Sequence, residues 1–479
     1  MVMKFNTCSI LFLVFFVCLT TRLNAQPKPN PMLQRSKAAL GLTTLKKPVL
    51  HFYYNQVRLA REQSDRVYPP YFTTSTNVEG WLNTEINTTF IKSNTIRVGS
   101  GPSDITSDYY SGISKYYSVR DTNYMPRSAF VEYDKMNAWT VLLDWAADPT
   151  VTQVKSGVYR DYDRLIFERP ALIGMERLFI DPKTYFPVKL DYEELNSLWG
   201  QLHIEIVYNN WLLNEGSYFP GSSFRIEDSQ PTIYRSFGRT ELNNSVSLFD
   251  RVKKLPTTSQ KNFNNEWYVS EQPKLIKISE QTYISKNNFY SETFTKIGDT
   301  LYLMDATLNE ERAKQDEKLI KGVFPDVSKF VVIVTDLAWP HIGGVRYWVS
   351  KGATIVSHAI SREFLQKVIN RKWTVQPDEL QKHPRAMRFV AVNKITNLAN
   401  GALKVIPIDG IESEGALICY LTGDKYLWGS DYFQNSQAAA ANSQEVINAA
   451  RRENIQPEKI AAEHVGLTDW SQLLKINKQ

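Results

Sequence analysis

Histidine and cysteine are scarce in this chain, which limits the ways in which it could bind a metal ion. The 479 residues include 6 His and 3 Cys. Cys8 and Cys18 lie in an apolar N-terminal stretch, so Cys419 alone would remain if that stretch were removed. One thiol cannot form an internal disulfide, and a disulfide-stabilised scaffold is therefore excluded. A metal site would contain few histidines or would be built partly from carboxylates.

The chain also lacks a large excess of charge of one sign. Lys and Arg number 56 against 50 Asp and Glu, a net charge of +6 without a basic stripe, so we expect no nucleic-acid partner. With 43% hydrophobic and 22% charged residues, the composition is that of a globular protein rather than a disordered or collagen-like one. The length predicts two or three domains.

After the N-terminal stretch, the chain has no long apolar run. Residues 1–25 themselves have the features of a secretory signal peptide. Lys4 precedes an apolar run from Ser9 to Thr20, and the small residue Ala25 stands before Gln26. An uncleaved membrane anchor is the alternative. We expect export to the periplasm or the cell exterior, with no transmembrane segment after signal removal. Peripheral association with the cell envelope is compatible with this location.

The next part of the chain is predicted to be rich in β-strands. Residues 26–45 contain much Pro, Asn and Lys and are predicted to be a flexible lead-in. A β-rich domain is expected over residues 46–252, beginning with a helical segment from His51 to Arg66. Glu176 to Ile180 and Tyr185 to Leu190 indicate two strands joined by a tight turn that contains proline. Successive short strands without long helices favour an antiparallel sheet.

The pattern of this region resembles the curved half-barrel of lipoprotein carriers. The resemblance is carried by the strand, turn and Phe-Pro-Val sequence ending at Val188, and by a second Phe-Pro at Phe219. It implies a curved antiparallel sheet whose concave face could hold an apolar ligand. The alternative is an interaction or packing domain without a ligand.

A polar linker is predicted at residues 253–265, and an α/β texture follows over residues 266–479. Val331 to Val334 form a β-branched run typical of a buried strand, which leads directly into the loop Thr335 to Gly344. Ligands of α/β folds bind at the carboxyl ends of strands. This loop is therefore the expected site of any chemistry.

The loop resembles the Thr-His-x-His-x-Asp-His-x-Gly-Gly motif of metallo-β-lactamase-fold hydrolases. Five further segments match that family in the same order along the chain: Tyr302 to Ala306, Gly352 to His358, Asp409 to Gly415, Trp428 to Asp431 and Ile460 to Gly466. The resemblance implies a four-layer αβ/βα sandwich after the linker. Together with the β-rich domain, this predicts an α+β protein of two domains.

The family's metal motif is retained only in part. Three of its ligand positions are unchanged, and the resemblance makes these residues metal ligands: His341, Asp431 and His464. Two positions that carry histidine in the family carry carboxylates here: Asp336 and Glu412. Two more cannot bind a metal through a side chain: Ala338 and Pro340. Of the other histidines, we expect a structural role for His358 and surface positions for His51, His203 and His383.

Two histidines and one carboxylate suffice for one divalent metal with open positions, either zinc or, with more carboxylates, manganese, iron or magnesium. Asp336 or Glu412 could add a ligand or act as a catalytic base. The first hypothesis is an exported hydrolase with a single metal, acting on an ester, thioester, amide or phosphoester of a small molecule. The second is a metal-free pseudoenzyme that serves as a binding or assembly module at the envelope.

Overall fold

The computed structural model describes most of the chain after the N-terminal stretch. The described residues are 30–59, 67–68, 71, 73–97, 104–112, 116–118, 123–124, 134–154, 156–250, 272–287, 290–408, 414–433 and 440–476. The predicted signal peptide, the predicted linker and Glu412 lie outside these ranges. Three β-sheets dominate the described part, which confirms the expectation of a sheet-rich chain with mixed α and β structure.

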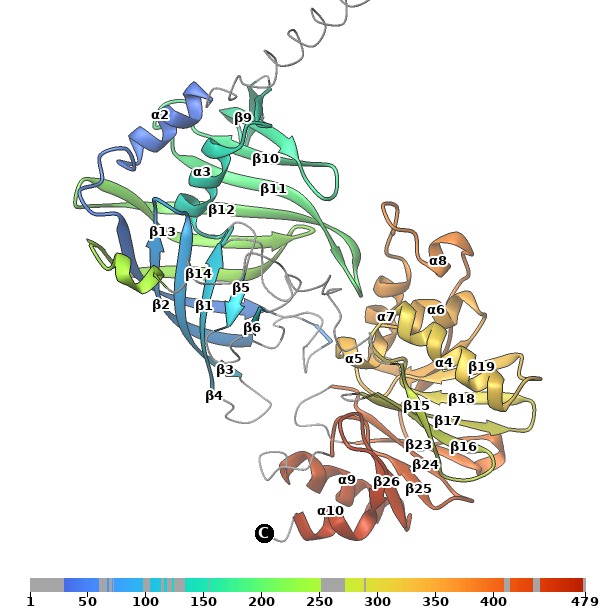
Figure 1. The fold of residues 1–479 in the computed structure, drawn as a ribbon. Helices are drawn as coiled ribbons and strands as arrows, with labels where there is room; N and C mark the ends of the chain where they lie inside the picture. The colour runs from blue at the N-terminus through green and yellow to red at the C-terminus, as the bar shows by residue number, and fades with distance from the viewer. Residues whose placement is uncertain are drawn as a thin grey trace, which may run out of the picture.

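The largest sheet has 14 strands, all paired antiparallel, and it curves around two helices (Figure 1). Its order is β6-β5-β4-β3-β2-β1-β14-β13-β12-β11-β10-β9-β7, and β8 pairs with β9. The strands are β1 (Val49–Leu59), β2 (Thr73–Asn83), β3 (Thr88–Arg97), β4 (Asp104–Gly112), β5 (Tyr116–Ser118), β6 (Asn123–Tyr124), β7 (Thr152–Gln153), β8 (Gly157–Tyr159), β9 (Tyr162–Pro170), β10 (Met175–Ile180), β11 (Pro187–Asn196), β12 (Gly200–Asn214), β13 (Ser217–Glu227) and β14 (Gln230–Asn243). A 3₁₀ turn, η2 (Val246–Phe249), follows β14.

The helix expected from His51 to Arg66 is wrong, because Val49–Leu59 is strand β1, paired with β2 and β14. Leu50, Phe52 and Tyr54 alternate onto the buried face, which is the period of a strand. His51 is also not at the open surface. Its ring stacks on Trp81 at a centroid distance of 4.7 Å, and its two nitrogens contact two glutamates across the neighbouring strands.

The predicted flexible lead-in is also wrong where it is described, because it contains helix α2 (Pro31–Ala39). Asn30 caps its N-terminus, and Leu33 is fully buried. Helix α3 (Ala138–Ala147) packs beside α2 on the inner face of the large sheet (Figure 1). Trp139 and Trp145 of α3 are buried in this core, so side chains fill the curve at that point. The apolar ligand expected in the concave face stays a prediction.

Two smaller sheets follow the large sheet in the described part of the chain. The 7-stranded sheet has the order β15 (Lys274–Lys277), β16 (Thr282–Lys286), β17 (Ser291–Ile297), β18 (Thr300–Met304), β19 (Lys329–Ile333), β20 (Thr354–His358) and β21 (Arg388–Val392). The 6-stranded sheet has the order β22 (Thr396–Leu398), β23 (Leu403–Pro407), β24 (Leu417–Leu421), β25 (Tyr426–Trp428), β26 (Lys459–Ala461) and β27 (Thr468–Asp469). The run β18 to β21 is parallel, as is the pair β25 and β26.

The two smaller sheets pack face to face, and helices cover their outer faces (Figure 1). One apolar cluster joins both sheets, with Ile333 and Val356 on one side and Cys419 and Trp428 on the other. The 7-stranded sheet is covered by α4 (Glu310–Val323), α6 (Val345–Ser350) and α7 (Arg362–Ile369), with the short α5 (Trp339–Ile342) and α8 (Glu379–Lys382) and the 3₁₀ turns η4 (Ala359–Ser361) and η5 (Ala399–Gly401) at loops. The 6-stranded sheet is covered by α9 (Ala440–Arg452) and α10 (Trp470–Ile476).

The large sheet and the α/β part touch through the β11–β12 turn. Arg371 donates to the backbone oxygens of Trp199 and Gln201 and forms an ion pair with Asp228 at 2.7 Å. The Trp199 ring also meets that of Phe364 edge to face at 5.4 Å. These contacts attach the large sheet to the end of α7.

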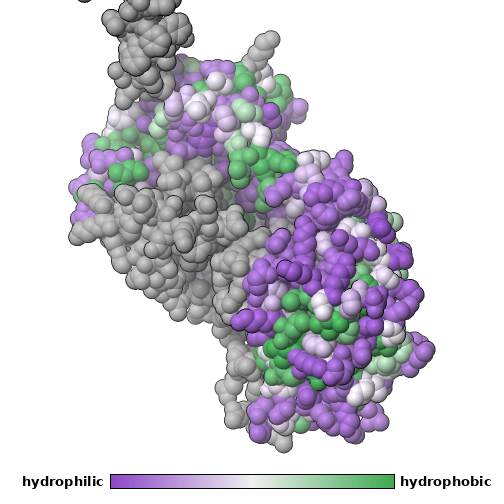
Figure 2. Space-filling model, turned by 45° about the vertical axis from the view of Figure 1, so that its right-hand side comes forward, coloured by the Kyte–Doolittle hydropathy of each residue, from purple (hydrophilic) through white to green (hydrophobic). Residues whose placement is uncertain are grey.

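The described part contains no helix that could span a membrane. No helix in it is long and apolar enough to cross a bilayer. In the view of Figure 2, the α/β part is mostly hydrophilic around one hydrophobic patch.

Candidate metal centre

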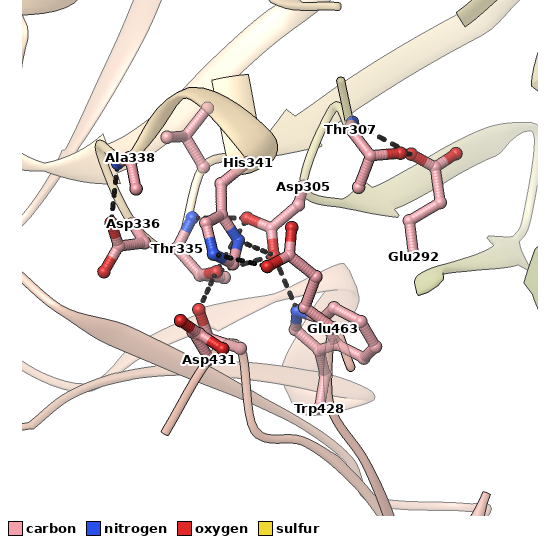
Figure 3. A network of polar contacts seen from close by, with 12 residues as sticks. Glu292, Asp305, Thr307, Thr335, Asp336, Ala338, His341, Trp428, Asp431 and Glu463 are labelled. Carbon is pink, nitrogen blue, oxygen red and sulfur yellow. Dashed lines mark hydrogen bonds and ion pairs between the residues drawn. The ribbon is translucent and has the colours of Figure 1, made fainter. Parts of the chain in front are cut away.

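The candidate site is built where strands of both smaller sheets end. Asp305 follows β18, and Thr335 lies two residues after β19, which runs parallel to β18. Trp428 ends β25, and Glu463 follows β26, its parallel neighbour. Because parallel strands end at one edge of a sheet, the four side chains meet between the two sheets. The short helix α5 places His341 next to these side chains (Figure 3).

Asp305 is the anchor of this site. It is fully buried, and its carboxylate accepts hydrogen bonds from the Thr335 backbone N at 2.9 Å and from the Thr335 hydroxyl at 2.7 Å. Trp428 Nε1 donates to it at 2.9 Å, and His341 Nδ1 lies 3.0 Å away. A buried carboxylate with four partners fixes the loops that bring them together.

His341 lies between two carboxylates. Its Nδ1 faces Asp305 and its Nε2 lies 3.3 Å from Oε2 of Glu463, and both His341 and Glu463 are 1% exposed. Histidines that bind metals commonly use one ring nitrogen for the ion and the other for a carboxylate. The contact with Asp305 therefore orients the ring so that Nε2 faces the Glu463 side.

The buried charges shift each other's protonation. Burial disfavours the charged imidazole, but the carboxylates of Glu463 and Asp305 outweigh it and hold the pKa of His341 well above its ordinary value. Burial also raises the pKa of Glu463 well above its ordinary value. The His341 cation opposes that rise, and the Asp431 charge adds to it. Both shifts favour the protonated forms of His341 and Glu463.

Asp431 and His464 complete the cluster on its more open side. Nε2 of His464 lies 3.6 Å from Oδ1 of Asp431 and 3.3 Å from Oε2 of Glu463. The side chains of His464 and Asp431 are 38% and 33% exposed, whereas that of Glu463 is 1% exposed. The aromatic ring of Tyr290 stands 5.2 Å from that of His464, and Trp339 is 6.2 Å beyond Tyr290. The cluster is therefore partly open to solvent on this side.

The donor atoms fit a divalent metal. Ligand atoms about 2.0–2.2 Å from a tetrahedral ion lie about 3.3–3.6 Å from one another, and the contacts of Glu463 Oε2 with the two imidazoles are both 3.3 Å. His341, Asp431 and Glu463 each offer an atom within 4.8 Å of the others. Glu463 Oε1 is buried without a hydrogen-bond partner among the described residues. His464 is not in that group of three, although its Nε2 lies 3.3 Å from Glu463, so the geometry brings together one imidazole and two carboxylates, a donor set that suits zinc, manganese or iron.

Asp336, one of the two predicted base candidates, is not part of this cluster. Asp336 Oδ1 accepts the backbone N of Ala338 at 2.7 Å, and Oδ2 accepts the hydroxyl of Tyr432. Figure 3 shows the Asp336 carboxylate directed toward Ala338 rather than toward Glu463. Glu412 lies outside the described residues.

Sequence reasoning missed Glu463 and the anchoring role of Asp305. In the sequence, both lie inside segments that match the family, where the resemblance gives neither of them a metal role. The available signal was their position, since each is an acidic residue one or two places after an apolar strand, and Glu463 directly precedes His464. The other histidines are separate from the cluster. His358 accepts the backbone N of Ile360 and so has a structural role, as expected.

A second group of donors, Asp191, His203 and Glu205, lies on the large sheet. Lys189 already lies between its carboxylates, at 2.9 Å from Asp191 and 2.8 Å from Glu205. The ammonium supplies the positive charge that an ion would bring. This group is thus a salt-bridge network and a useful contrast to the buried cluster.

Comparison with known proteins gives distant structural neighbours. No family model matches the chain, and no curated protein matches it significantly. The metallo-β-lactamase from Hirschia baltica is 13% identical, with a TM-score of 0.34, over 43% of this chain and 97% of its own. The enzyme from Pontibacter korlensis is 15% identical, with a TM-score of 0.33, over 43% and 98%. Similarity at this level does not establish what the present chain does.

Proposed function

We propose that the chain is a hydrolase of the metallo-β-lactamase superfamily that works with one divalent metal ion. The observation that carries the proposal is the position of Glu463. Its Oε2 lies 3.3 Å from Nε2 of both His341 and His464, and its Oε1 has no hydrogen-bond partner among the described residues. The ligands would be His341, Glu463, Asp431 and His464, which adds one carboxylate to the set expected from the sequence.

The arrangement of the α/β part supports the superfamily assignment. Two face-to-face sheets between helices correspond to the αβ/βα sandwich that the sequence motif implies. The loop from Thr335 to Gly344 follows β19 and places His341 at the edge between these sheets. This is where the motif would bind metal. We assign the fold on this topology together with the motif.

The chain's own residues have separable roles in the proposed reaction. A bound ion would polarise a carbonyl or phosphoryl oxygen and lower the pKa of a water molecule. Asp305 keeps His341 in the orientation needed for binding. The rings of Tyr290 and Trp339 border the exposed side of His464 and would contact the apolar part of a small substrate. Asp336, held by Ala338 and Tyr432, stays a candidate base, as does Glu412.

Metal content and hydrolysis together test this function. The purified chain is expected to hold about one equivalent of zinc, manganese or iron, and to hydrolyse a member of a panel of esters, thioesters, amides and phosphoesters. Treatment with a chelator should abolish the turnover, and the ion should restore it. Less than about a tenth of an equivalent, even after incubation with each metal, would contradict the proposal.

A catalytically inactive binding or assembly module is the second candidate. It is favoured by Ala338, which has no donor atom, and by Asp336, whose two oxygens are both engaged. In the same experiment, a folded chain that holds no metal and turns over no member of the substrate panel would support this candidate. Peripheral association with the cell envelope is also part of this second candidate function.

We also propose that the chain is exported, on the basis of its first 25 residues. Lys4, the apolar run that follows and Ala25 are the features that a signal peptidase would require. Mass spectrometry of the protein expressed with its full N-terminus in a bacterial host should find a mature chain that begins at Gln26. Recovery of the uncleaved chain would indicate an anchor instead.

A further inference from the structure

We propose that a groove on the outer face of the large sheet binds an oligosaccharide. The groove lies on four neighbouring strands, β14, β1, β2 and β3 (Figure 1). It shares no residue with the candidate metal centre, so its ligand is independent of the proposed hydrolase activity. It is also on the other face of the sheet from the concave side, where an apolar ligand is predicted.

The groove is a cavity of about 570 Å³, a volume in the range of small-molecule sites. Alternate residues of a strand point to opposite faces of its sheet. Tyr54 and Phe237 point to the inner face, where their rings meet edge to face at 5.4 Å in the main apolar core. Tyr53 therefore points outward, and its hydroxyl donates to Glu79 at 2.8 Å on the outer face.

Two rows of outward side chains border the groove, and each row runs across β1, β2 and β3. One row consists of Tyr53, Glu79 and Lys92, and the other of Asn55, Asn77 and Asn94. The rows are two residues apart in each strand, which separates them by about 7 Å. The residues between the rows point to the inner face, so the floor of the groove is backbone. The groove thus crosses the strands and suits an elongated ligand.

The row of asparagines has unused hydrogen-bonding capacity. Asn55 Nδ2 donates to Asn77 Oδ1 at 3.1 Å, and the exposed Asn77 keeps its NH₂ group for a ligand. Asn94 Oδ1 is buried and has no hydrogen-bond partner among the described residues. A buried oxygen without a partner costs free energy, and a ligand hydroxyl would satisfy it.

These groups favour a ligand with many hydroxyls. A hydroxyl both donates and accepts, as an amide side chain does, whereas an apolar ligand would remove water from the amides without replacing it. The Tyr53 ring is 40% exposed and offers an apolar surface to the C–H face of a sugar ring. Glu79 and Lys92 lie opposite each other on β2 and β3, so the groove does not select an anion or a cation.

A peptide is a poorer match for the groove. Peptides that bind to sheets commonly add a strand at an open edge. Strands β1 and β2 are paired on both sides, so they offer no such edge at the groove.

Titration calorimetry of the purified chain with cellotetraose, maltotetraose, mannotetraose and chitotetraose tests the proposal. We expect at least one of them to bind with a Kd below about 1 mM. Asn77→Ala and Asn94→Ala should each weaken this binding by about tenfold or more. Asn370→Ala is the matched control, because Asn370 is an exposed asparagine of the α/β part that accepts from Gln366. It should bind the sugar as the parent does.

Asn94→Ala also separates a binding role from a structural one. Because Asn94 Oδ1 has no partner among the described residues, its removal should leave the Tm of the free chain at least as high as that of the parent. A lower Tm would show that Asn94 serves the fold and would overturn its role as a ligand-binding residue.

Three other results would overturn the proposal. The first is a parent chain that binds none of the four sugars, and the second is equal binding by the parent, Asn77→Ala and Asn94→Ala. The third is binding that a chelator abolishes, because the sugar would then occupy the metal centre. Binding of tetra-alanine in place of the sugars, lost in Asn77→Ala, would assign the groove to a peptide instead.

Discussion

Glu463→Gln is expected to empty the metal centre, leaving less than about a tenth of an equivalent after dialysis where the parent chain keeps about one. Glu463 lies 3.3 Å from both imidazoles, and its other oxygen is buried without a hydrogen-bond partner in the described structure. Glutamine keeps the volume but loses the negative charge that offsets a divalent ion. Its amide nitrogen would also compete for one of the two oxygen positions. Metal analysis of both proteins, prepared in parallel, measures the difference.

Glu458→Gln provides the matched control, since Glu458 is an exposed glutamate that pairs with Lys425 on the surface. It should retain the full metal content of the parent. His464→Ala should weaken binding less than Glu463→Gln, because the His464 side chain is 38% exposed and the Glu463 side chain is buried. Full metal content in Glu463→Gln would return the ligand set to the three residues expected from the sequence motif. His341, Asp431 and His464 would then bind the ion without Glu463.

The general architecture could be predicted from the sequence because its strands have clear periodic patterns. Val331 to Val334 form a continuous β-branched run, and the structure has the buried strand β19 there, with its end at the site. The error at His51 to Arg66 has a physical cause. Leu50, Phe52 and Tyr54 alternate with polar residues over only a few positions, and the polar residues after them are compatible with a helix. Only pairing with β2 and β14, which are distant in the sequence, makes this segment a strand.

The candidate site was predictable only as far as the motif reached. His341 stands out because it precedes two glycines after a buried strand, and Gly343 is packed so closely against Leu308 that a side chain would clash there. Glu463 has a weaker signal, its position after a strand and directly before His464, and this signal is easily passed over because an acidic residue in a loop is usually solvated. Its importance comes from burial between β26 and His341, a property of the packed sheets. The hydrogen bond between Tyr432 and Asp336 likewise joins residues 96 positions apart in the chain, so no local sequence pattern indicates it.

Asp305→Ala is expected to lower the stability of the α/β part by about 3–5 kcal/mol, the range for removing one partner of a buried charged network. The carboxylate is fully buried and has contacts with Thr335, His341 and Trp428. Removing it leaves four donors without their acceptor at a place where the two smaller sheets meet. The raised pKa of His341 would also lose the contribution of one of the two carboxylates beside it. Chemical unfolding followed by tryptophan fluorescence, with a chelator in all samples so that metal loss does not contribute, measures the change.

Asp299→Ala is the matched control, because Asp299 is 71% exposed and its partner Lys329 is also at the surface. Such an exposed pair contributes little, so its loss should leave the stability unchanged within the error of the measurement. Asp305→Asn should fall between the two, since it keeps the volume and one acceptor oxygen but turns an NH₂ group toward a donor. A loss below about 1 kcal/mol for Asp305→Ala would contradict the role of Asp305 as the anchor. The loops after β18, β19 and β25 would then be held by packing alone, and the orientation of His341 would need another cause.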